Sequence, residues 1–225
     1  MKLTYFGHSA FLIQSGDFKG LIDPFFTGNS HTSTKPKDLK DISHIFISHG
    51  HGDHIGDTEA IAKRWNSLII CNFEISNYLS QKGLKTHPLH IGGRRKFDFG
   101  LVKMTPALHG SGIQDGNKMV EGGLAGGFII EINGKKIYHA GDTGLSMEMK
   151  LLERENIDLA LLPIGGNFTM DIEDAILAVD FIKPRKVIPI HYKTFDVIDV
   201  DPEEFKEKVK NVEVEVLPPG GTIEV

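Results

Sequence analysis

The sequence has few of the features that mark secreted or membrane proteins. It contains one cysteine, Cys71, so no disulfide can form within the chain, which favours a reducing, cytoplasmic setting. Cys71 lies in the apolar run 68–71, which indicates an inert core thiol. No apolar run is long enough for a membrane span, and the first residues lack the apolar segment of a signal peptide.

The sequence also lacks a large excess of charge of either sign. It has 25 basic and 30 acidic residues and a net charge of −5, which predicts no general attraction to nucleic acid or acidic membranes. No linker rich in Pro, Ser or Gly divides the chain, so we expect residues 1–225 to form a single domain. The oligomeric state stays open, and a homo-oligomer is compatible with the sequence.

The most informative stretch that is present is Ser-His-Gly-His-Gly-Asp-His at 48–54. Three histidines and one aspartate stand within six positions, after the apolar run 45–47. The glycines allow the backbone to coil tightly, so that the polar side chains can turn toward one centre. Imidazole and carboxylate groups suit zinc or another first-row divalent metal. The stretch therefore predicts a metal-binding loop.

The order of apolar runs and turn signals predicts an α/β fold with two sheets covered by helices. Asn133-Gly134 predicts a hairpin, and Asp57 is expected to cap the helix that follows it. The segments 27–43 and 111–123 are expected to be loops that shape a pocket. We expect strands at 44–48, 67–71, 128–132, 136–138, 159–163, 186–190 and 212–217, two or three more within 3–26 and three within 84–108, and helices at 58–65, 73–82, 145–155, 171–182 and 202–210.

Three more candidate ligands, His109, Asp142 and His191, each follow a predicted apolar strand. The 49–54 loop does the same, and side chains at the same end of successive strands can converge on one rim. Five histidines and two aspartates are too many for one tetrahedral zinc, but they suit two adjacent metals. Asp142 is the natural bridge because a carboxylate has two oxygens.

In this order, the motifs resemble those of the metallo-β-lactamase superfamily. The resemblance rests on His-x-His-x-Asp-His at 49–54, the lone His109, Asp142 in Gly-Asp-Thr-Gly, and the late His191. It implies a four-layer αβ/βα sandwich with the metal site at one rim of the two sheets. It also implies that His49, His51 and His109 bind a first metal, that Asp53, His54 and His191 bind a second, and that Asp142 lies between them.

Other segments indicate which branch of the superfamily the sequence resembles most. Residues 6–9, 21–24 and 166–170 resemble those of small predicted metal-dependent hydrolases near the ascorbate-6-phosphate lactonase branch. Position 51 is His, whereas the di-iron, oxygen-reducing branch has Glu there, and this difference favours a hydrolytic site over a redox site.

Four residues near the motifs have open roles. His8 is expected to act as an acid or substrate contact, to hydrogen-bond a ligand, or to be structural. Asp23 is either a partner for the Nδ1–H of a ligand histidine or a turn residue. Asn167 either donates to an oxyanion or holds its loop. His139 is expected to be structural or to support a ligand nearby.

These residues predict a metal-dependent hydrolase with a small-molecule substrate. We expect a hydroxide held between two divalent ions, zinc first, with Mn, Fe or Ni as alternatives, to attack an ester, lactone or phosphodiester. Asp53 would orient the hydroxide, and His8 or a water would protonate the leaving group. One alternative is a nuclease or phosphodiesterase acting on nucleic acid, for which Arg94-Arg95-Lys96 is a weak indication. Another is a metal-dependent binding or sensing protein without turnover.

Overall fold

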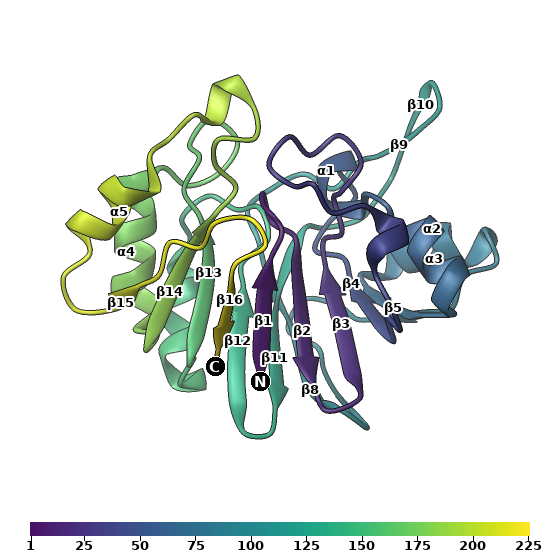
Figure 1. The fold of residues 1–225 in the computed structure, drawn as a ribbon, viewed down its shortest axis with the longest axis horizontal. Helices are drawn as coiled ribbons and strands as arrows, with labels where there is room; N and C mark the ends of the chain where they lie inside the picture. Colours follow the sequence, from purple (N-terminus) through teal and green to yellow (C-terminus); the bar gives the residue numbers. More distant parts are fainter.

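Two seven-stranded sheets face each other in the computed structural model, which describes residues 1–225. Helices cover the outer face of each sheet, α2 and α3 on one side and α4 and α5 on the other (Figure 1). This is the α/β fold with four layers that the sequence and its resemblance predict. The first sheet has the order β16-β1-β2-β3-β4-β5-β6, with β1 Lys2–Tyr5, β2 Phe11–Ser15, β3 Phe18–Ile22, β4 His44–Phe46, β5 Leu68–Cys71, β6 Thr86–Pro88 and β16 Thr222–Glu224.

The second sheet pairs its strands in the order β15-β14-β13-β12-β11-β8-β7. Its strands are β7 Arg94–Phe97, β8 Gly100–Pro106, β11 Gly126–Ile132, β12 Lys135–His139, β13 Leu159–Pro163, β14 Lys186–Ile190 and β15 Glu213–Val214. The helices are α1 Gly52–Ile55, α2 Thr58–Trp65, α3 Phe73–Gln81, α4 Ile172–Ile182 and α5 Pro202–Lys208, with 3₁₀ helices η1 Pro36–Asp38, η2 Met147–Glu155 and η3 Asp196–Ile198. None of these helices is long and apolar enough to cross a membrane.

The strand residues alternate between two apolar layers, as the two-residue period of a strand requires. On β11, Phe128 and Ile130 belong to the core between the sheets, whereas Ile129 belongs to the core under η2 and α4. A third cluster packs the first sheet against α2 and α3, and it includes the fully buried Cys71. Burial raises the pKa of this thiol, which fits the predicted inert core residue.

Most predicted elements are confirmed, including the hairpin at Asn133-Gly134, where both residues have positive φ. The predicted loop 111–123 is wrong in part, because it contains a second hairpin, β9 Ile113–Asp115 and β10 Lys118–Val120. Asp115-Gly116 between these strands is a hairpin signal in its own right. The predicted helix 145–155 is a 3₁₀ helix capped by Ser146.

Three further predictions need correction. The closing strand 212–217 is reduced to β15, while β16, a short strand paired with β1, was not expected. The predicted metal-binding loop 48–54 runs into one helical turn, α1, which was not predicted because glycine-rich sequence does not favour a helix. Asp57 occupies the N-cap position of α2, as predicted, but its carboxylate accepts hydrogen bonds from the N–H groups of Phe26 and Thr27 and not from those of the helix.

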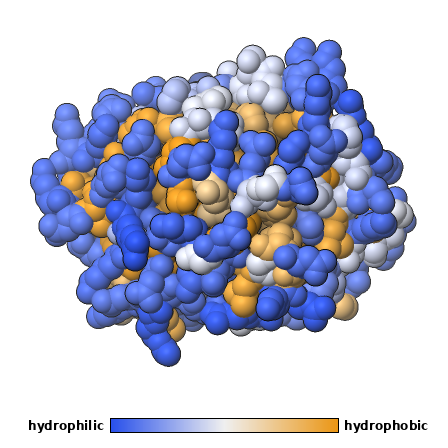
Figure 2. All heavy atoms as spheres, turned by 60° about the horizontal axis from the view of Figure 1, so that its bottom comes forward, coloured by the Kyte–Doolittle hydropathy of each residue, from blue (hydrophilic) through white to orange (hydrophobic).

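The first and last strands lie side by side in the first sheet, which places the two chain ends together. The Val225 N–H donates to the Met1 carbonyl, and the Met1 ammonium lies 3.5 Å from Glu224. Both ends lie at the bottom of Figure 1, whereas α1 and the β9–β10 hairpin lie at the top. Figure 2 brings this lower end forward and shows a largely hydrophilic surface with smaller apolar areas.

Candidate metal centre

The predicted ligands come together at the top end of both sheets. The loop after β4 supplies His49, His51, Asp53 and His54 from the first sheet. The segments after β8, β12 and β14 supply His109, Asp142 and His191 from the second. The predicted placement of each candidate after a strand is therefore confirmed, and the candidates form one continuous cluster between the sheets.

One part of the cluster contains three imidazoles. The Nε2 of His49 lies 3.1 Å from the Nδ1 of His51, and the Nε2 of His109 lies 3.3 Å from that same Nδ1. Neutral imidazole has one N–H and one lone pair, so ring nitrogens this close either share an N–H···N hydrogen bond or direct lone pairs toward a common point. A divalent cation at that point would satisfy all three.

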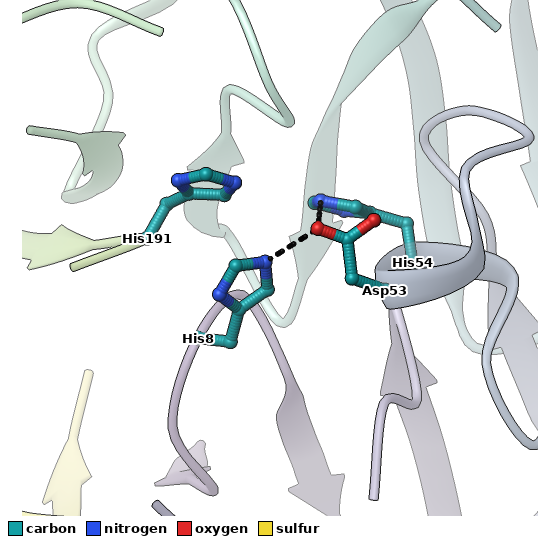
Figure 3. A group of neighbouring side chains, drawn as sticks. All are labelled: His8, Asp53, His54 and His191. Atoms are coloured by element: carbon teal, nitrogen blue, oxygen red, sulfur yellow. Dashed lines mark hydrogen bonds and ion pairs between the residues drawn. The ribbon is translucent and has the colours of Figure 1, made fainter. Parts of the chain in front are cut away.

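The other part contains His54, His191, Asp53 and Asp142. The Nε2 of His54 lies 3.1 Å from Asp142 Oδ1, and the Nε2 of His191 lies 2.9 Å from Asp142 Oδ2. Asp53 Oδ2 is 3.9 Å from the Nε2 of His54 (Figure 3). Asp142 also lies 3.6 Å from His109, so it contacts residues of both parts, as the predicted bridge should.

Buried Asp23 orients a histidine in each part. Asp23 Oδ2 accepts a hydrogen bond from the Nδ1–H of His54 at 2.8 Å, so the predicted partnership with a ligand histidine is confirmed. The same oxygen accepts from the Ser48 hydroxyl at 2.6 Å, and that hydroxyl lies 3.0 Å from the Nδ1 of His49. Both rings are thereby held with Nε2 facing the cluster.

Unpaired polar atoms test whether a metal fits. His54 Nε2 and Asp142 Oδ1 are completely buried and have no hydrogen-bond partner. Because Nδ1 of His54 already donates to Asp23, its Nε2 presents a lone pair toward a carboxylate oxygen, unless a proton or a cation lies between them. Burial lowers the pKa of His54, but the carboxylates of Asp142 and Asp23 more than offset this effect and raise it. The site therefore favours a positive charge at this point, and its donor set fits a divalent metal.

His8 lies beneath the cluster and is fully buried. Its Nε2–H donates to Asp53 Oδ2 at 3.1 Å (Figure 3), and its Nδ1 lies 2.6 Å from the Thr194 hydroxyl. Burial lowers the pKa of His8 to about 4, against the opposing effect of Asp53, so the ring is neutral at pH 7. Of the three predicted roles, this geometry fits a hydrogen bond to a ligand best.

Three residues of the site have left-handed backbone conformations that the sequence does not reveal. His8, Asp23 and His191 have φ values of 57°, 43° and 56°. Such conformations are strained for residues other than glycine and recur at functional sites. Asn167 also has positive φ, at 43°, but its side chain is exposed and makes no hydrogen bond. Its catalytic role therefore stays a prediction.

Comparisons with known proteins agree with this geometry. The family model described as "Beta-lactamase superfamily domain" matches residues 20–192. A "UPF0173 metal-dependent hydrolase" of Alkaliphilus metalliredigens is 57% identical over 218 residues, which cover 96% of each chain. The chain belongs to the metallo-β-lactamase superfamily.

Other relatives of this superfamily member are also described as hydrolases. The "UPF0173 metal-dependent hydrolase YtkL" of Bacillus subtilis is 49% identical over 229 residues. This match covers all of both chains. The solved structure of Igni18, described as a novel metallo hydrolase from Ignicoccus hospitalis, superposes with a TM-score of 0.90 at 40% identity. That match covers all of this chain and 98% of Igni18. The chain is thus a metal-dependent hydrolase of the metallo-β-lactamase fold.

Proposed function

We propose that the chain is a dinuclear hydrolase that cleaves an ester, lactone or phosphodiester of a small molecule. The observation that supports this most is that the seven predicted donors, together with His8, lie in overlapping groups close enough to share metal ions, and that Asp142 contacts histidines of both parts. Two bound divalent cations would supply an acidified water and polarise the electrophile. Zinc fits best because imidazoles dominate the donor set, with Mn, Fe and Ni as alternatives.

In this proposal, His49, His51 and His109 hold the first ion, Asp53, His54 and His191 hold the second, and Asp142 bridges them. The His8 N–H fixes one oxygen of Asp53, which leaves the other free to orient water. Asn167 would contact the substrate from its exposed loop. A cytoplasmic setting is supported by the lone, buried Cys71.

The surroundings of the cluster favour a small substrate with an apolar part over nucleic acid. Six of the ten exposed large hydrophobic side chains belong to segments at the end of the sheets where the candidate ligands lie: Leu108, Met119, Leu124, Phe168, Phe195 and Val197. Leu108 directly precedes His109, and the ring of Phe195 lies 5.5 Å from that of His8. Of the candidate phosphate contacts Arg94-Arg95-Lys96, Arg94 pairs instead with Glu155 at 2.8 Å.

The test is hydrolysis by protein that has been stripped by a chelator and then reloaded with Zn, Mn, Fe or Ni. Substrates should include acyl esters, lactones and thioesters, simple phosphodiesters, and RNA or DNA. We expect activity to vanish with the metal, to return at two ions per chain, and to be absent in His49→Ala. Activity that survives both chelation and His49→Ala would refute the proposal. Strongly salt-dependent binding and cleavage of RNA or DNA would replace it with the nuclease alternative.

A further inference from the structure

His139 is a buried histidine that stands outside the seven donors but contacts segments on both sides of them. It ends β12, three residues before Asp142, and has no exposed surface. Its Nε2 lies 3.0 Å from the carbonyl oxygen of Ser9, and the N–H of Gly141 donates to its Nδ1 at 3.1 Å. Both ring nitrogens are therefore in use.

These two partners fix the protonation of the ring. A backbone N–H can only donate, so the Nδ1 of His139 must carry a lone pair. A carbonyl oxygen can only accept, so Nε2 must carry the proton and donate to Ser9. His139 is thus a neutral imidazole with its proton on Nε2, and either a second proton or the other tautomer would break a buried hydrogen bond.

Each partner of His139 directly neighbours a residue of the metal cluster or a residue that hydrogen-bonds to it. Gly141 precedes Asp142 and has a φ of 64°, and a Cβ at this glycine would lie only 2.7 Å from the carbonyl oxygen of Gly126. Ser9 follows His8, which has a φ of 57° and donates to Asp53. The two backbone segments come from different sheets, and the His139 ring spans the gap between them.

We infer that His139 is a positioning residue of the metal centre, whose ring holds the Asp142 turn of one sheet against the His8 turn of the other. Because Asp142 would bridge the two proposed ions and His8 hydrogen-bonds Asp53, the ring sets the spacing of donors that it never touches. This inference rests on the metal centre proposed above.

Three substitutions separate the two hydrogen bonds. In His139→Asn, the side-chain carbonyl can still accept from Gly141 but no longer reaches Ser9. In His139→Gln, the longer amide can still donate to Ser9. His139→Leu removes both bonds with little change in volume, and His87→Leu, on β6 of the first sheet away from the cluster, is the matched control. The readouts are metal stoichiometry, affinity in competition with a chromophoric chelator, and the absorption spectrum of the cobalt-loaded protein.

We expect His139→Leu to weaken metal binding by roughly 10–100-fold, as loss of a residue that supports metal ligands does, and to alter the cobalt spectrum. Asn and Gln should each recover part of the affinity, while His87→Leu should match the wild type. Unchanged affinity and spectrum in a folded His139→Leu variant would overturn the inference. If the Leu variant does not fold, wild-type affinity and spectrum in both His139→Asn and His139→Gln would overturn it.

A second measurement does not depend on metal. Nitrogen-15 NMR of the metal-free protein should show His139 protonated on Nε2 and not on Nδ1. A charged ring or the opposite tautomer would contradict the inference. If wild-type protein binds no metal while His139 shows this tautomer, the failure lies with the proposed metal centre and not with the assignment of the ring.

Discussion

At the scale of single residues, the orientation of the metal centre depends on side chains that bind no metal. Asp23 is the clearest case, because one carboxylate oxygen accepts from both His54 and Ser48. The other oxygen, Oδ1, accepts from the Ser48 N–H at 2.8 Å, so an amide in this place would turn its NH₂ group toward a donor.

We therefore expect Asp23→Asn to lower metal affinity by roughly 10–100-fold. Chelator competition measures this loss, and Asp17→Asn, in an exposed turn, is the control. Wild-type affinity in a folded Asp23→Asn protein would contradict the orienting role.

Residue types in a pattern could be read from the sequence, but their backbone strain could not. The gathering of the candidate ligands at one end of the sheets follows from their positions after strands, and a pairing of Asp23 with one of the candidate histidines follows from chemistry, whereas the sequence leaves open which histidine it is. The left-handed conformations of His8, Asp23 and His191 depend on contacts with distant segments, such as the bond from the His191 N–H to the His8 carbonyl. No local pattern encodes such contacts.

At the scale of elements, the ligand loop depends on one glycine for space. A Cβ on Gly50 would lie 2.5 Å from the Ser111 carbonyl oxygen and 2.6 Å from Ile113, whereas a Cβ on Gly52 would meet nothing within 4 Å. The β9–β10 segment thus packs against the metal-binding loop at Gly50.

We predict that Gly50→Ala lowers the free energy of unfolding by about 1–3 kcal/mol, the usual cost of overpacking, and also weakens metal binding. Gly52→Ala, in the same loop, should change neither. Denaturant unfolding and metal titration of the two variants measure the difference. If the two variants have the same unfolding free energy and the same metal affinity, the loop can move to accommodate a side chain at position 50, and the prediction is wrong.

The 3₁₀ helix η2 is tied to the second sheet by an ion cluster around Glu155. Arg94 and Lys103 each approach its carboxylate to 2.8 Å. Burial raises the pKa of Glu155, but the hydrogen bond and charge of Lys103, with Arg94 and Lys136, more than offset this and hold the pKa below its ordinary value. A lowered carboxyl pKa stabilises the fold above the unfolded-state pKa, and this contribution is lost as the pH falls through the folded-state pKa.

Glu155→Gln should therefore cost about 1 kcal/mol of unfolding free energy at pH 7, since solvent partly screens the cluster. The difference from wild type should shrink below a pH of about 4. Urea unfolding at several pH values measures it, with the exposed Glu148→Gln on the same helix as control. A difference that stays constant down to acid pH would argue against the ion cluster as its source.

Short elements account for most errors of the sequence-based prediction. Apolar runs such as 128–132, which lies within β11, are predicted correctly because burial on both faces leaves a clear pattern. α1, β9, β10, β15 and β16 have two to four residues each, too few for a period to emerge. They form because a neighbour is already in place, as β1 is for β16.

At the scale of the whole molecule, the core between the sheets contains residues of both, among them Phe46 of β4 and Phe128 of β11, whose rings lie 5.7 Å apart. We propose that residues 1–225 are one domain, because separating the sheets would expose this core. Thermal unfolding should then show one transition, with coincident curves for circular dichroism and for the fluorescence of Trp65 on α2. Two separated transitions would indicate two units.

The neighbouring ends of the chain have a practical consequence. Because Met1 and Val225 lie together, away from the ligand loops, the molecule can be immobilised or fused to a reporter through either end while the catalytic side faces the medium. A short peptide joining them should also allow circular permutation, with new ends opened at a turn such as Gly83, where a side chain would meet no neighbour.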